Sequence, residues 1–136
     1  MPNLSRRLDA LRDDLLNDKG FILFKKFPAD QWNNHKNAVA YMGLGTYLGY
    51  FVSQNGRGHV LGHVKDTGDD ATKIDKVRIY RTTARQFFHA DDSDIVGLLC
   101  LHRAQEGGES DLVSMHHVWN TLQKEHPDVA DRKSVV

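Results

Sequence analysis

An uninterrupted apolar run from Ile95 to Leu101 is the feature that most limits how this chain can fold. The run is too short for a membrane-spanning helix, which needs about 20 apolar residues. It also lacks the polar positions that recur along an amphipathic helix. A short run of this kind is typical of a strand that is covered on both faces. We therefore predict a central strand here, with the chain's single cysteine, Cys100, in the core.

Shorter apolar patterns predict three further strands, at 21–24, 77–80 and 111–114. Seven of the eleven glycines lie between Gly43 and Gly68, a density that disfavours a long helix in that stretch. We expect loops there, with close approaches of the backbone to other parts of the chain.

Helices are expected at both ends of the chain and once between the strands. Leucines spaced three and four apart predict a helix over 4–15, which Gly20 follows as a terminating residue. A second helix is expected over 30–42, with Asp30 as its capping residue. A third begins after Ser114 and must end before Pro127. The side chains expected in the core from the second helix are Trp32, Val39 and Met42.

Composition excludes several classes of protein. The chain has 136 residues, which is the length of one domain. Its 18 Lys and Arg balance its 18 Asp and Glu, so no strong positive field is available to bind nucleic acid or an anionic membrane surface. Cys100 has no partner for an intramolecular disulfide, and no signal-peptide pattern is present. We expect a soluble cytoplasmic protein that binds neither nucleic acid nor membrane.

His89 and Asp91 form the strongest candidate site. In an extended segment, residues two apart point to the same face, so an imidazole and a carboxylate would be directed at one point. These are two of the three ligands in the 2-His-1-carboxylate set that holds Fe(II) in oxygenases and leaves coordination positions open. Taken alone, a His-x-Asp pattern is a weak signal that occurs by chance in many chains, and a surface turn is the more common explanation.

A second candidate lies downstream, where Gly107 and Gly108 precede Glu109 and Ser110. Two glycines in succession are typical of a tight turn. The hydroxyl of Ser110 can donate a hydrogen bond to a carboxylate beside a metal, or it can simply be solvated in a hairpin turn. The residues alone leave both interpretations open.

Three segments taken together, 82–91, 94–101 and 104–110, resemble the first half of the TauD/TfdA-type Fe(II)/2-oxoglutarate-dependent dioxygenases, in the branch common in fungi. The resemblance implies an α+β fold, a partial double-stranded β-helix (jelly roll) with flanking helices. It implies that His89 and Asp91 are the first two ligands of Fe(II), and that Ser110 contacts a carboxylate of the co-substrate 2-oxoglutarate. It also implies a small-molecule substrate.

The same resemblance shows which parts of the family pattern have no matching position here. These are a distal iron-binding histidine and an arginine that pairs with the far carboxylate of 2-oxoglutarate. Residues 129–136 form an atypical tail, so we expect residues 1–136 to be a single incomplete domain without its C-terminal half. The chain is then either a dioxygenase, inactive by itself, or a non-catalytic fragment that pairs with another chain and self-associates through exposed strand edges.

Five other histidines are weaker candidates for metal ligands. His116, His117 and His126 lie near Ser110 in sequence but on or beside a predicted helix, where a half-exposed histidine is the common case. His59 and His63 are four apart, but glycines surround them and Val60 stands where a zinc protease has its glutamate.

By the resemblance, the stretch from Gly49 to Gly68 lies at the mouth of a barrel and shapes a substrate pocket. Its polar side chains are candidate lining residues: Gln54, Asn55, His59 and His63. A flexible loop with no contact to substrate is the alternative, because surface loops both carry function and vary without it.

Overall fold

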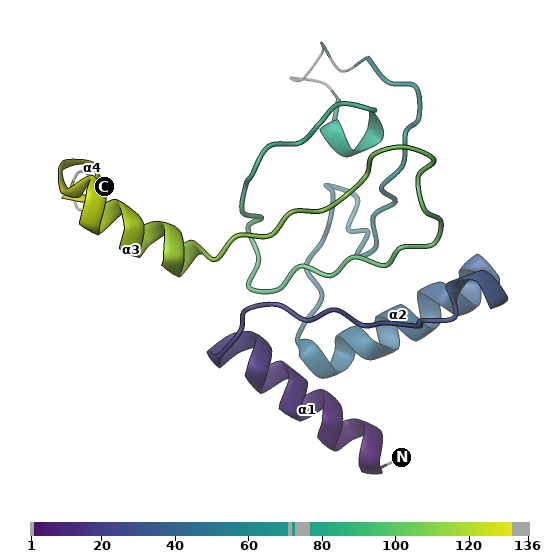
Figure 1. Cartoon of the computed structure of the whole chain (residues 1–136). Helices are drawn as coiled ribbons and strands as arrows, with labels where there is room; N and C mark the ends of the chain where they lie inside the picture. The colour runs from purple at the N-terminus through teal and green to yellow at the C-terminus, as the bar shows by residue number, and fades with distance from the viewer. Residues whose placement is uncertain (1, 71, 73–76, 132–136) are drawn as a thin grey trace. The chain divides into compact units, whose positions relative to one another are not determined.

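The structure is a computed structural model that describes residues 2–70, 72 and 77–131 (Figure 1). Its elements are all helical. In chain order they are α1 (Pro2–Asn17), the 3-10 helix η1 (Ala29–Gln31), α2 (Asn34–Leu48), the 3-10 helix η2 (Ile79–Arg81), α3 (Met115–Glu125) and α4 (Pro127–Asp131). Within these described ranges no residue belongs to a β-strand.

The predicted α+β fold with a partial jelly roll is therefore wrong for this structure. Segments 21–24, 95–101 and 111–114 are coil, and 77–80 runs into η2 instead of a strand. A strand requires a neighbouring strand whose backbone groups pair with its own. The loops contain isolated backbone hydrogen bonds. Examples are the bond from Gln54 N–H to the His59 carbonyl at 2.6 Å and that from Thr67 N–H to the Arg81 carbonyl at 2.9 Å. Single bonds of this kind close turns and do not build a ladder.

Contacts between residues divide the chain into two compact units. Unit 1 comprises residues up to 9 and residues 34–99, and unit 2 comprises residues 10–33 and those from 100 onward. Helix α1 thus contributes its first half to unit 1 and its second half to unit 2.

Helix α1 confirms the leucine periodicity. Leu8 is buried, with 2% of its surface exposed, and Leu11 and Leu15 are half-buried. The helix ends at Asn17, and Gly20 follows with a φ of 74°, in the left-handed region that glycine adopts without strain.

The second predicted helix is displaced. Helix α2 begins at Asn34 instead of Asp30, which lies inside η1, and it continues through Gly43 and Gly45 to Leu48. The glycine density therefore did not end the helix. Instead Gly45 permits a close approach, because a Cβ built on it would lie 2.7 Å from Cε1 of Phe51.

Segment 95–99 approaches α2 within unit 1. A Cβ built on Gly97 would lie 2.6 Å from the hydroxyl oxygen of Tyr41, so only glycine leaves room for that phenol. Burial raises the pKa of the Tyr41 phenol above its usual 10.0. The phenol of Tyr41 therefore lies partly out of water beside the backbone of Gly97.

In unit 2, helix α3 confirms the third predicted helix. Ser114 is its N-cap, and the Ser114 hydroxyl oxygen accepts a hydrogen bond from the backbone N–H of His117 at 3.3 Å. Helix α3 ends at Glu125, and Pro127 begins α4, which packs against it. The predicted tail 129–136 overlaps α4, and its residues 132–136 lie outside the described residues.

Burial is sparse compared with what the apolar pattern predicts. Leu8 is the one hydrophobic side chain that is fully buried within the described ranges. In the 95–101 segment Val96 is 54% and Leu98 73% exposed, and Cys100 is exposed as well. The expectations of a strand covered on both faces and of a core Cys100 are therefore wrong.

The core predicted from the second helix is confirmed only in part. Trp32 and Met42 are half-buried, whereas Val39 is 59% exposed. Trp32 precedes α2 and packs edge-to-face against Phe27, with 5.6 Å between the ring centroids.

Among the described helices, none is long and apolar enough to cross a membrane.

Candidate metal centre

His89 and Asp91 lie in a non-helical segment of unit 1, between η2 and the apolar run. Their side chains converge: Nε2 of His89 is 3.8 Å from Oδ1 of Asp91. First-row divalent ions bind imidazole nitrogen and carboxylate oxygen at about 2.0–2.2 Å, so two atoms sharing an ion lie within about 4 Å of each other. The pair is therefore spaced so that one ion can contact both atoms.

Each ring nitrogen of His89 has one hydrogen-bonding neighbour. Nδ1 of His89 lies 2.7 Å from the carbonyl oxygen of Phe87, which can only accept, so Nδ1 is the donor. Nε2 of His89 lies 3.0 Å from the amide nitrogen of Gln86, which can only donate, so Nε2 is the acceptor. With the Gln86 amide nitrogen placed against Nε2, the two contacts agree on one arrangement of the imidazole, with Nδ1 donating and Nε2 accepting. It presents the lone pair of Nε2, the form in which histidine binds a metal.

Both side chains remain accessible. The exposed fraction is 48% for His89 and 56% for Asp91. A contact this exposed contributes little to stability, because water and salt screen the charge of the carboxylate. The arrangement is therefore better explained by local backbone geometry than by attraction between the two groups, and it leaves room for an ion and further ligands.

A set of contacts earlier in unit 1 holds the segment that leads to the site. Nε of Arg81 lies 2.9 Å from Oδ2 of Asp69, and the hydroxyl of Thr67 donates to the same oxygen at 2.8 Å. The backbone N–H of Thr67 donates to the carbonyl of Arg81. Sequence reasoning missed this cluster, because contacts across fourteen residues leave no periodic signal.

Ser110 belongs to unit 2, where it is exposed and non-helical. The preceding Gly107 and Gly108 have φ values of 71° and 79°, in the left-handed region that glycine adopts without strain. The contact of Ser110 with a 2-oxoglutarate carboxylate stays a prediction.

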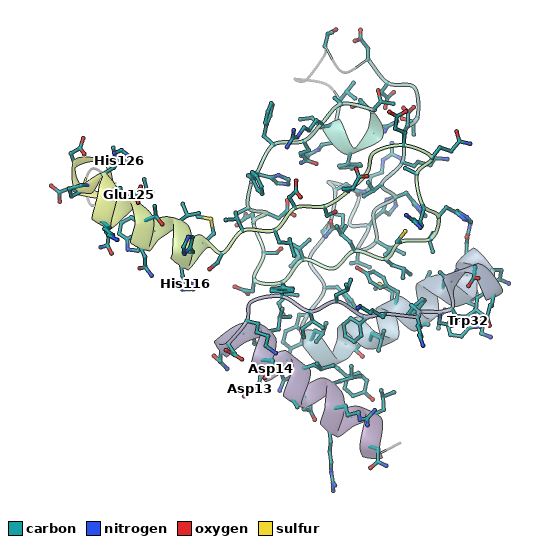
Figure 2. The ribbon with its side chains drawn as sticks, in the orientation of Figure 1. Asp13, Asp14, Trp32, His116, Glu125 and His126 are labelled. Atoms are coloured by element: carbon teal, nitrogen blue, oxygen red, sulfur yellow. The ribbon has the colours of Figure 1, made fainter. Side chains whose placement is uncertain are left out.

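Three of the other histidines lie on or beside α3: His116, His117 and His126. His116 lies near the start of the helix, and Glu125 and His126 lie at its far end, as Figure 2 shows. The side chains of His116 and His126 are thus separated along the helix and do not form a pair. In the part of the chain that the structure describes, no group of three or more His, Cys, Asp or Glu is placed to hold a metal ion.

His59 takes part in a turn organised by Asn55. The side-chain nitrogen of Asn55 donates to Nδ1 of His59 at 3.1 Å, and its oxygen accepts from the backbone N–H of Arg57 at 3.0 Å. Gln54 N donates to the carbonyl of His59 and closes the turn. These bonds give His59 a structural partner, and the suggested role in lining a substrate pocket stays a prediction.

A comparison with protein-family models matches residues 1–136 to the "Taurine catabolism dioxygenase TauD, TfdA family". Two curated proteins are similar over most of this chain. FR-33289 synthase of Streptomyces rubellomurinus is 32% identical over 81% of the chain and 32% of its own length. Taurine hydroxylase-like protein SAT17 of Stachybotrys chartarum is 27% identical over 96% of the chain and 36% of its own length.

The chain therefore spans about a third of the length of these curated relatives. No solved structure matches it.

Proposed function

Since the chain belongs to the taurine catabolism dioxygenase TauD/TfdA family, we propose that it carries part of the iron centre of an Fe(II)- and 2-oxoglutarate-dependent dioxygenase. Nε2 of His89 and Oδ1 of Asp91 are the proposed protein ligands, and the Ser110 hydroxyl is the proposed partner of a 2-oxoglutarate carboxylate. The proposed substrate is a small molecule, and the proposed compartment is the cytoplasm.

One observation supports this proposal most directly. The tautomer of His89 presents Nε2 as a lone-pair donor, and the same nitrogen lies 3.8 Å from a carboxylate oxygen. Nitrogen and oxygen donors of this kind suit non-haem Fe(II).

The chain's own residues have limited tasks in this proposal. The Phe87 carbonyl orients the imidazole by holding Nδ1–H, and Asp91 supplies negative charge beside Nε2. Bound Fe(II) would supply open coordination positions for the co-substrate and dioxygen. Two protein ligands leave most positions to water or to groups from elsewhere, so we expect weak binding of the metal.

The test is anaerobic addition of Fe(II) and 2-oxoglutarate to the purified protein, with the visible absorption of the iron chelate as the measurement. We expect a weak charge-transfer band that is lost in His89→Ala. His35→Ala is the matched control, because it removes an exposed histidine of the same unit, and it should keep the band. A wild-type protein without a band, or a band that survives His89→Ala, contradicts the proposal.

A second candidate function is a non-catalytic chain that works when paired with another chain. The observation that favours it is the number of large apolar side chains left in water, such as Leu23 at 72% and Leu112 at 75% exposure. Exposed apolar surface of this extent is typical of an interaction site.

A further inference from the structure

We propose that the side-chain amide of Gln86 occupies the metal-binding nitrogen of His89, so that a metal ion must displace Gln86 in order to bind. This inference rests on the proposed function, because it assigns Gln86 a part in the same centre. Gln86 is a positioning residue in this scheme: it acts on the metal through His89.

The direct observation is the 3.0 Å distance between Nε2 of Gln86 and Nε2 of His89. The amide nitrogen of glutamine carries two N–H groups and accepts no hydrogen bond. The imidazole nitrogen therefore has to accept. The Gln86 amide nitrogen thus lies within hydrogen-bond distance of the atom whose lone pair a metal would use.

The contact is local in sequence and needs no distant element. Gln86 and His89 are three residues apart in one non-helical segment of unit 1. Asp91 approaches the same nitrogen, with Oδ1 at 3.8 Å. The amide and the carboxylate thus both lie close to one atom of His89, and an ion that enters between His89 and Asp91 competes with the amide.

Loss of the amide does not release the imidazole. The 2.7 Å bond from Nδ1 of His89 to the Phe87 carbonyl is independent of Gln86 and keeps the same tautomer. Replacement of Gln86 by leucine therefore removes a competitor and leaves the ligand oriented. A neutral hydrogen bond in water has a modest net strength, so the affinity for metal should rise about two- to tenfold.

The first measurement uses the metal-free protein. Long-range ¹H–¹⁵N correlation spectra of the imidazoles report whether Nε2 of His89 accepts a hydrogen bond. We expect the ¹⁵N resonance of Nε2 to shift towards the value of a free, unprotonated ring nitrogen in Gln86→Leu, while Nδ1 stays protonated. Gln105→Leu, at an exposed glutamine in unit 2, is the matched control and should leave both resonances unchanged. An unchanged Nε2 resonance in Gln86→Leu overturns the inference.

The second measurement is anaerobic calorimetric titration with Fe(II) alone. We expect Gln86→Leu to bind two- to tenfold more tightly than the wild-type protein and Gln105→Leu, with Gln86→Ala as a second variant that repeats the effect. If both Gln86 variants bind Fe(II) no more tightly than the wild-type protein, Gln86 does not compete with the metal. The same conclusion holds if none of the proteins binds Fe(II).

The two measurements separate this inference from the proposed function. A shifted Nε2 resonance with no Fe(II) binding by any protein means that the contact exists but the iron centre does not. Fe(II) binding that His89→Ala abolishes and Gln86→Leu leaves unchanged means that the iron centre stands without a competing amide.

Discussion

At the scale of single residues, some contacts of the site can be predicted from the sequence and others cannot. The spacing of His89 and Asp91 predicts that they converge, and the 3.8 Å approach agrees with it. The partners of His89 were not predicted. A backbone carbonyl such as that of Phe87 accepts a hydrogen bond whatever its side chain, and Gln86 becomes a partner only in one local conformation.

The contact between Gly97 and Tyr41 yields a prediction at the same scale. Gly97→Ala places a methyl group 2.6 Å from the Tyr41 hydroxyl oxygen, so one of the two must move. We expect the free energy of unfolding to fall by about 1 kcal/mol, the low end of overpacking costs, because Gly97 is exposed. Urea denaturation measures the change.

A second substitution identifies the cause of that loss. Tyr41→Phe removes the oxygen. Gly97→Ala should therefore lower the free energy of unfolding less in the Tyr41→Phe background than in the wild-type protein. Equal losses in the two backgrounds would mean that the phenol is not what Gly97 accommodates.

At the scale of elements, local signals were sufficient for some helices and insufficient elsewhere. Helices α1 and α3 follow from leucine spacing and from Ser114 as a cap, both of which act within a few residues. The predicted start and end of the second helix were wrong. Asp30 lies in η1, and glycine weakens a helix without forbidding it, so α2 continues to Leu48. The strands were wrong, since an apolar run shows no pairing partner.

The cap of α3 gives a prediction for that element. In Ser114→Ala the backbone N–H of His117 loses its side-chain acceptor. We expect the helix to lose about 1 kcal/mol of stability and to fray at its first turn. Amide hydrogen exchange at residues 115–118 is the measurement, and faster exchange there is expected. Ser93→Ala, at an exposed serine outside the helices, is the control, and the same exchange rates in both variants would exclude a role for the cap.

At the scale of the whole molecule, few apolar side chains are buried, and this favours self-association. The helices and the His89–Asp91 approach are local, whereas a core depends on contacts between distant segments that apolar patterning does not specify. Apolar side chains are exposed in both units: Phe87 in unit 1 is 81% exposed, and Leu112 in unit 2 is 75% exposed. Self-association through such side chains is our proposal, in place of strand edges, because the described ranges hold no strand.

Light scattering at several concentrations tests that association. We expect the average mass to exceed 15.4 kDa and to rise with concentration. A variant with Leu23→Lys and Leu112→Lys should lie closer to the monomer mass, because two large apolar side chains are replaced by charged ones. A wild-type mass that stays at the monomer value across the series argues against association.

The bond from His89 to the Phe87 carbonyl has one more consequence. Because the acceptor belongs to the main chain, position 87 can exchange its side chain for almost any other while the imidazole keeps its orientation. The ring that lies 81% exposed at that position is thus available for a separate task, such as contact with an apolar molecule, and its replacement need not disturb the neighbouring ligand.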